Sequence, residues 1–393
     1  MNLTLCKGIA VIIDDKIFPK PGEPIDQIVK ITKKINENGI PFCAYDKLSD
    51  AQKSIDNFGS VNFLILDWDL YGDLNVEDPE ILIRPNHSGK VVKFIKDFIN
   101  VCFCPIFIFS NANVSDIKDT LITNGLYFEN KNNYIYVQAK KDLIRGNKLF
   151  NMINGWVDHN PTIYTLKNWE NSFLLSKNSV FWHLFKKSPI WPRVLWQSFD
   201  EDTVDPQSNL NDIIYRLIKS RTSLSNLDAA KIKKRGKIDI EEVKDVIQGT
   251  MYIKGDYLPA NDYSPGDIFK KNGNYYINIR PECDTIIGRE GCDGHLYLLK
   301  GSKLTSAQFR KKHYHKKYGL LKDHNNFLLY GLDSKDFVRF NLKTLEIVQF
   351  NAAGTRLCRL LSPYVNDVQQ QFSSYVGRFG LPRIPNAVLN SIK

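Results

Sequence analysis

The sequence has no apolar run long enough to cross a lipid bilayer, and residues 1–20 lack the pattern of a secretory signal. A spanning helix needs about 20 consecutive apolar residues. The longest candidate, residues 98–109, is interrupted by Asn100 and Pro105, which indicates the entry to a buried strand instead. We therefore expect a protein without membrane contact, located in the cytoplasm.

Closely paired cysteines are also missing. The seven cysteines are an odd number and include no C-x2-C pair, the spacing typical of structural zinc sites. Four of them lie in apolar segments, which favours reduced thiols over a disulfide framework. A looser group could supply four zinc ligands, although incidental cysteines and histidines are the favoured interpretation. Its members are Cys283, Cys292, His295, His313 and His315.

Internal repeats and low-complexity tracts are absent, and the composition excludes a disordered chain. Of the 393 residues, 43% are hydrophobic and 12% aromatic, enough for packed cores in two or three domains. The net charge of +10 is uneven, because residues 1–150 carry 18 Lys+Arg and 19 Asp+Glu whereas residues 151–393 carry 35 and 24. The basic rear part permits a polyanionic partner such as nucleic acid without requiring one.

The first 150 residues alternate strand and helix signals. This alternation predicts an α/β domain with a parallel five-stranded, flavodoxin-like sheet and helices on both faces. The expected strands are 8–14, 40–45, 61–67, 104–110 and 133–138, and the expected helices are 24–38, 49–57, 87–101, 113–124 and 141–153.

The rest of the chain divides into a helical middle segment, 151–245, and a β-rich domain, 246–393. Five of the six tryptophans fall in the middle segment, where we expect buried anchors between helices. The opening of the β-rich part, Gly266–Phe269, is faintly similar to the first strands of MazF/PemK-type small barrels. We expect strands at 267–280, 294–300, 325–331, 335–341 and 344–350, then a terminal helix on the apolar positions Leu357, Leu360, Leu361, Val365, Val368, Phe372 and Tyr375, ending at 377–382.

Carboxylates close two of the apolar strands of the front domain. Asp14 and Asp15 follow the first, and Asp67 and Asp69 follow the third. A carboxylate is unfavourable inside a core, so these residues mark the edge of the sheet. Parallel neighbours bring their carboxyl ends to one edge, where open α/β sheets place their chemistry. Hard oxygen ligands gathered there suit Mg²⁺.

Together with a serine and a lysine, these carboxylates resemble the site of a response-regulator receiver domain, the CheY-like phosphoacceptor module. The resemblance covers roughly residues 1–150, and no family resemblance extends to the rear part. The matching residues come after the first, third, fourth and fifth expected strands, in the family's order: Asp14, Asp15, Asp67, Ser110 and Lys140.

In receiver domains, the aspartate of the third strand accepts a phosphoryl group from the phosphohistidine of a kinase. The resemblance therefore implies that Asp67 is the phosphoacceptor, that Ser110 binds a phosphoryl oxygen and that Lys140 pairs with the acyl phosphate. The implied partner is a histidine kinase or a kinase-like ATPase. The implied ligands of Mg²⁺ are Asp14, Asp15, Asp67 and the backbone carbonyl of Asp69.

This receiver is divergent. Its loop after the third strand, Tyr71–Ser88, is long, and Lys140-Lys141 stands where the family has a Lys-Pro pair. Similar divergent receivers occur beside histidine-kinase-like ATPases in bacterial conflict and phage-defence loci, which implies a role in antiviral defence. Two alternatives stay open at this point: inert carboxylates on a flavodoxin-like fold, and a receiver fold that is never phosphorylated.

The rear part offers weaker candidates for binding. A basic run interleaved with Tyr314 and Tyr318 could hold phosphates and stack on bases, although a solvated loop is the commoner explanation. We expect a signalling protein whose basic output domain binds nucleic acid or a partner protein, with a homodimer as one possible assembly. The alternatives are a nuclease-like effector gated by a pseudo-receiver, and a structural adaptor. The candidate contacts are Arg280, Arg310, Lys311, Lys312, Lys316 and Lys317.

Overall fold

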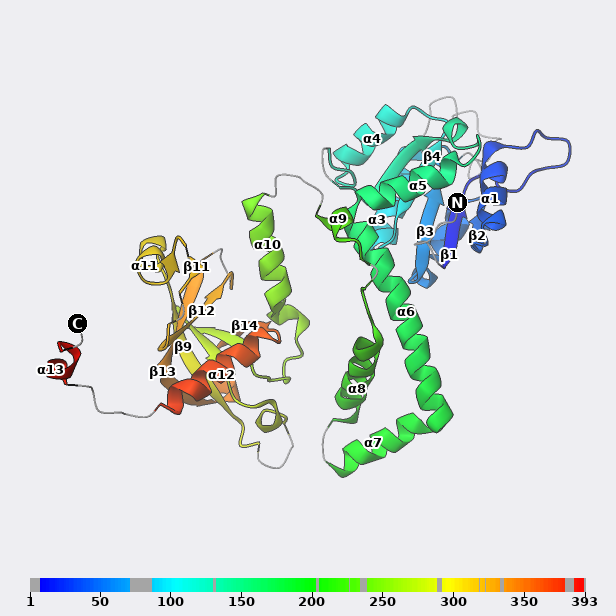
Figure 1. The fold of residues 1–393 in the computed structure, drawn as a ribbon. Coiled ribbons are helices and arrows are strands. Elements are labelled where there is room, and N and C mark those ends of the chain that lie inside the picture. Colours follow the sequence, from blue (N-terminus) through cyan, green and yellow to red (C-terminus); the bar gives the residue numbers. More distant parts are fainter. Residues whose placement is uncertain are drawn as a thin grey trace. The chain divides into compact units, whose positions relative to one another are not determined.

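The computed structural model (Figure 1) forms two compact units, which are described separately below. One unit comprises Met1–Pro189 and Ile213–Arg235, and the other comprises Ile190–Asp212 and Gly236–Lys393. The sequence-based limits at 150 and 245 stay predictions. None of the described helices is both long and apolar enough to span a membrane. The structure describes residues 8–70, 87–129, 132–202, 205–225, 227–233, 239–287, 292–317, 319–321, 323–332, 336–378 and 385–391.

The first unit is built on a parallel five-stranded sheet, as predicted. Its strand order is β2-β1-β3-β4-β5, which is compatible with a flavodoxin-like fold. All six residues of β3 are buried, because a parallel sheet with helices on both faces exposes neither side of its central strands. The strands are β1 (Ile9–Ile13), β2 (Phe42–Tyr45), β3 (Val61–Leu66), β4 (Ile106–Ser110) and β5 (Ile135–Ala139).

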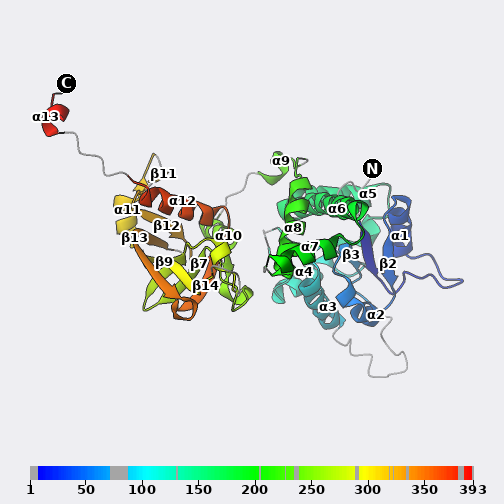
Figure 2. The same cartoon turned by 90° about the horizontal axis from the view of Figure 1, so that it is seen from below.

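Helices cover the two faces of this sheet in two groups (Figure 2). On one face, Ile31 of α1 and Ile153 of α5 join the core formed with Phe63 and Phe107. The other core includes residues of α2, α3 and α4, such as Phe94 of α3. The elements are α1 (Gln27–Glu37), α2 (Leu48–Lys53), η1 (Ile55–Asn57), α3 (His87–Val101), α4 (Val114–Thr123), η3 (Lys140–Asp142) and α5 (Lys148–His159).

The middle of the chain is helical, but most of its tryptophans are not buried anchors. Trp156 packs edge-on against Phe107, with ring centroids 5.4 Å apart. In contrast, Trp169 and Trp196 are 43% exposed and Trp182 is 62% exposed, so the expectation was wrong for these three. Helix α6 is about 40 Å long at 1.5 Å per residue, and its buried residues all lie between Ile163 and Val180. The helices are α6 (Pro161–Lys187), α7 (Trp191–Glu201), α8 (Pro206–Arg221), α9 (Ala229–Ile232) and α10 (Ile240–Met251).

The second unit contains an antiparallel seven-stranded sheet in the order β12-β13-β9-β8-β7-β14-β6. Asn272 and Gly273, both with positive φ, make the two-residue turn between β7 and β8. The hydroxyl of Tyr252 in β6 donates to the carbonyl oxygen of Tyr330 in β12 at 2.8 Å, so the two edge strands approach each other in a curled, half-barrel sheet. The strands are β6 (Tyr252–Lys254), β7 (Asp267–Lys271), β8 (Asn274–Asn278), β9 (His295–Lys303), β12 (Asn326–Tyr330), β13 (Phe337–Gln349) and β14 (Thr355–Leu360).

The end of this unit corrects one expectation. The apolar spacing predicted a helix that included Leu357 and Leu360, but these residues belong to strand β14. The terminal helix begins after Pro363 and ends before Gly377, close to its predicted end. Two strands expected at 335–341 and 344–350 are the single strand β13, whose pairing with β9 is irregular between Phe340 and Leu345. The remaining elements are η4 (Gly255–Tyr257), η5 (Glu282–Asp284), α11 (Ser306–Lys312), β10 (Tyr314–His315), β11 (Gly319–Leu320), η6 (Phe350–Ala352), α12 (Tyr364–Val376) and α13 (Asn386–Leu389).

Candidate metal and phosphoryl site

The backbone of β1 and β3 brings their terminal aspartates to the same edge of the sheet. The amide of Asp67 donates to the carbonyl oxygen of Ile13 at 2.9 Å, and the amide of Asp14 donates to the carbonyl oxygen of Tyr45 at 3.0 Å. Both strands therefore end level with each other, because parallel neighbours in this register present their carboxyl ends together.

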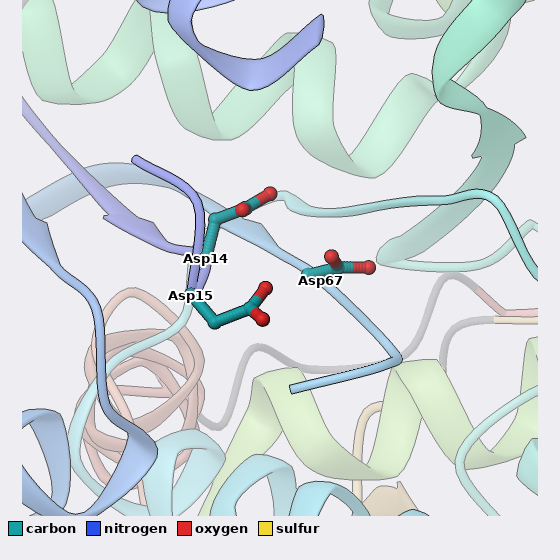
Figure 3. A group of neighbouring side chains, drawn as sticks. All are labelled: Asp14, Asp15 and Asp67. Atoms are coloured by element: carbon teal, nitrogen blue, oxygen red, sulfur yellow. The ribbon is translucent and has the colours of Figure 1, made fainter. Parts of the chain in front are cut away.

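Three carboxylates meet at this edge (Figure 3). Asp14, Asp15 and Asp67 each offer an oxygen, and these oxygens lie within 4.8 Å of one another. Asp14 is 1% exposed and Asp67 is 5% exposed, so two of the three charges are almost removed from water. The pKa of Asp14 is raised to about 6 as the net result of burial, which raises it most, of Lys140, which lowers it, and of the charge of Asp67, which raises it.

Lys140 lies at the centre of the cluster. Its ammonium is 2.6 Å from Oδ2 of Asp14 and 2.5 Å from Oδ2 of Asp67, and the side chain is 2% exposed. Burial alone would lower the pKa of Lys140, but the charges of Asp67 and Asp14 outweigh it and raise the pKa overall. The structure thus brings together the fifth-strand lysine and the third-strand aspartate that the sequence singled out.

The composition of this cluster fits a cation. Three carboxylates gather around one ammonium in a largely buried pocket. A group of oxygen donors of this kind is the environment that hard cations prefer. Asp14, Asp15 and Asp67 could therefore hold a metal ion, and they are the one such group found among the residues that the structure describes.

Ser110 and Asp69 complete the edge. The Ser110 hydroxyl donates to Oδ2 of Asp69 at 3.4 Å and accepts from the amide of Ala112 at 3.3 Å. The amide of Asp69 donates to Oδ1 of Asp67 at 3.3 Å. The sequence predicted a role for Asp69 only through its backbone carbonyl and did not predict the contact of its carboxylate with Ser110. This contact links Ser110 in β4 with Asp69 after β3. The two residues are 41 positions apart, so no local sequence pattern predicts the contact.

The candidate residues of the second unit do not form one site. Arg310, Lys311, Lys312, Lys316 and Lys317 are exposed on α11 and beside β10. Arg280 is 3% exposed, and its guanidinium donates to a carboxylate oxygen of Asp293 and to the carbonyl oxygen of His295.

The candidate zinc ligands are likewise not gathered in the described part of the chain, which agrees with the favoured interpretation that these cysteines and histidines are incidental. Cys283 lies in η5 and His295 begins β9. His313 is buried between α11 and β10, and the pKa of its ring is lowered chiefly by burial. None of the six cysteines within the described residues forms a disulfide. The loop Tyr71–Ser88 lies largely outside the described residues.

No protein-family model matches this sequence, and no curated protein matches it either. The class that the structure itself defines is an α/β protein with a parallel sheet of flavodoxin-like strand order, a lysine-bridged acidic cluster at the carboxyl edge, and a separate curled antiparallel domain.

Proposed function

We propose that this protein is a receiver-like signalling protein that accepts a phosphoryl group on Asp67. The observation that carries the proposal is the ammonium of Lys140 held between Asp14 and Asp67 at the carboxyl edge of the sheet. A structural ion pair would need one carboxylate. The gathering of three around one buried ammonium is better explained by a site for a cation and a phosphoryl group.

The chain's own residues have distinct roles in this reaction. An Asp67 carboxylate oxygen forms a bond to phosphorus while the bond from phosphorus to the donor breaks, and the leaving histidine nitrogen takes up a proton from water. Lys140 neutralises charge as the acyl phosphate forms. The Ser110 hydroxyl, which donates a hydrogen bond to Asp69 in this structure, could rotate toward a phosphoryl oxygen. A bound Mg²⁺ would neutralise negative charge on the transferring group.

The proposed partners follow from this chemistry. A histidine kinase or kinase-like ATPase in the cytoplasm would supply the phosphoryl group. Once formed, the acyl phosphate would draw Ser110 away from Asp69 and change the surface beside β4. The second unit, with its basic α11, would carry the output by binding a partner.

Phosphoryl labelling of the full-length protein tests the proposal. Radiolabelled acetyl phosphate with Mg²⁺ should label the wild type at a bond that hydroxylamine cleaves, as expected of an acyl phosphate. Asp67→Asn should reduce the label to background, because the amide cannot act as the nucleophile. Asp46→Asn is the matched control, since Asp46 follows β2 at the same edge but is outside the cluster. Equal labelling of wild type and Asp67→Asn would rule out Asp67.

If the wild type takes up no label, the cause is either an inactive site or a poor small-molecule donor, and the two must be distinguished. For that purpose the same three proteins are melted with Mg²⁺ and beryllium fluoride, a mimic of the phosphoryl group. Binding to the native state raises the melting temperature. The absence of any rise in the wild type, together with no label, would leave a pseudo-receiver as the better description.

A further inference from the structure

The second unit contains an aromatic cleft beside its most basic segment. The cleft has a volume of about 510 Å³ and lies between α10, α11 and the β12–β13 pair, elements that can be followed in Figure 1. This volume is within the range of about 300–1,000 Å³ typical of small-ligand pockets. Its lining residues are Lys244, Leu304, Ser306, Phe309, Arg310, Tyr314, Tyr330, Asp336 and Phe337.

Four aromatic rings are in contact along this cleft, three of them stacked and the fourth, Tyr330, tilted. Phe309 lies parallel to Phe337, with ring centroids 4.2 Å apart and planes inclined by 8°. Tyr314 stacks on Phe309 at 6.2 Å, and Tyr330 contacts Phe337 at 5.1 Å. Tyr314 is 45% exposed, so the stack ends on a ring that a flat ligand can reach. Flat aromatic surfaces of this kind are platforms for unpaired nucleobases.

Positive charge surrounds the exposed end of the stack. Residues 294–317 contain seven Lys+Arg and no Asp or Glu. Arg310 is in the cleft itself, and the capping box of Thr305 and Gln308 fixes the start of the short helix that carries it. Asp336 is the acidic residue that lines the cleft, and the lining residue Lys244 pairs with Glu241 at 2.5 Å, so the uncancelled run of positive charge belongs to α11 and β10. A polyanion would therefore follow α11 and β10.

We infer that this cleft binds single-stranded nucleic acid. A base would stack on Tyr314, and the backbone phosphates would lie along Arg310, Lys311 and Lys312 on α11 and along Lys316 and Lys317 beyond β10. A duplex hides its base faces and could use only the charges, so the aromatic stack favours a single strand. The cleft belongs to the second unit alone, so the test of nucleic-acid binding is independent of the test of phosphorylation at Asp67.

Fluorescence anisotropy with the full-length protein tests the inference. The probes are a fluorescein-labelled single-stranded RNA of mixed sequence and the same sequence as a duplex, each titrated over a range of salt. We expect tighter binding of the single strand and an affinity that falls with salt, by a logarithmic slope of about 0.7 for each phosphate contact. Replacing both Lys311 and Lys312 by glutamine should reduce that slope.

The stacking ring gives the sharper comparison. Tyr314→Ala should weaken binding of the single strand by about 5- to 150-fold, the range expected for loss of one base stack. Tyr257→Ala is the matched control, since Tyr257 is an 80% exposed tyrosine of the same unit outside the cleft. Circular dichroism melts should confirm that both variants fold. We expect them to, because both rings are exposed and contribute little to the core.

Three results would overturn the inference. The first is the absence of binding to either RNA. The second is equal affinity for duplex and single strand, together with equal affinities of Tyr314→Ala and Tyr257→Ala for the single strand. The third is binding to vesicles that contain phosphatidylserine but not to RNA, which would make the basic segment a membrane contact instead.

Discussion

At the scale of single residues, the acidic cluster is unfavourable for stability and therefore informative about function. Asp14 is nearly buried, and its carboxyl has a pKa of about 6 even with the ammonium of Lys140 at 2.6 Å. At neutral pH the ionised form is thus held in an environment that disfavours it. A protein gains nothing in stability from such a residue, so its presence points to a ligand that needs the charge.

Replacing Asp14 by asparagine should stabilise the first unit at neutral pH. The folded pKa is raised from 3.8 to about 6, so the wild type loses stability as the pH rises through this interval, by about 3 kcal/mol at 1.36 kcal/mol per unit. Asparagine does not ionise and avoids this loss. In chemical denaturation with EDTA present, the variant should exceed the wild type at pH 7 and approach it below about pH 4.

The control for this comparison is Asp119→Asn on the exposed surface of α4. It should change the free energy of unfolding by no more than about 0.5 kcal/mol at either pH. A variant Asp14→Asn that is less stable than the wild type at pH 7 would show that the ion pair with Lys140 outweighs the burial of the carboxylate.

The sequence predicted the residues of this cluster better than their contacts. Asp14, Asp15 and Asp67 were predictable because carboxylates that end apolar strands can only lie at a sheet edge. The register of β5 was also needed to place Lys140 rather than Lys141 in the pocket. The hydrogen bond from Ser110 to Asp69 depends on the side-chain positions set by two strands, and the spacing of residues along the chain does not predict it.

At the scale of elements, a buried ion network ties β7 to β14. Asp267 has no exposed surface, and its carboxylate accepts from Nε of Arg359 at 2.7 Å and from the amide of Ser264 at 2.9 Å. Arg356 lies 3.5 Å from the same carboxylate. The network stabilises the pairing of two strands that are separated by more than 80 residues.

Replacing Asp267 by alanine should destabilise the second unit by about 3 kcal/mol, because Arg359 and Arg356 lose the buried carboxylate that they share, and Arg359 keeps only its pair with the exposed side chain of Asp262 at 2.8 Å. The measurement is the free energy of unfolding by urea, compared with Asp256→Ala on the exposed η4 as the control. Adding Arg359→Met to Asp267→Ala should restore part of the loss, since it removes a positive charge that has lost its buried counterion. No recovery in the double variant would mean that the network acts through packing alone.

The predictability of the elements differed between the two units. Strands such as β3 and β4 are continuous apolar runs with clear ends, and a parallel sheet covered on both faces produces that pattern directly. Strand β14 was missed because its apolar residues continue into α12 at spacings that also fit one long helix. The turn at Pro363 separates them. The stack of Phe309 on Phe337 joins residues that are 28 positions apart. The basic run around Tyr314 alone could not predict it.

At the scale of the whole molecule, the chain combines two units with separate cores. The cores of the first unit draw on residues up to Tyr164 and on Leu227, whereas those of the second begin at Met251. Residues 1–150 are close to neutral and the excess of positive charge follows them. The proposed cation site and the proposed nucleic-acid cleft therefore lie in different cores, and a ligand for one should stabilise that unit first.

Magnesium should raise the melting temperature of one unit only. A cation that binds the native state at 100 times its dissociation constant adds about 2.7 kcal/mol, and the acidic cluster belongs to the first unit. Calorimetry of the full-length protein should show one transition that rises with Mg²⁺ and one that does not. Asp267→Ala identifies the second transition, because it should lower that transition and leave the other unchanged.

The variant Asp67→Asn removes a ligand of the cluster and should abolish most of the rise, while Asp46→Asn should keep it. A rise of both transitions together, or a rise that persists in Asp67→Asn, would place the bound cation outside the pocket formed by Asp14, Asp15 and Asp67. In that case a ligand other than Mg²⁺, such as a basic peptide, would be the group to seek at these three carboxylates.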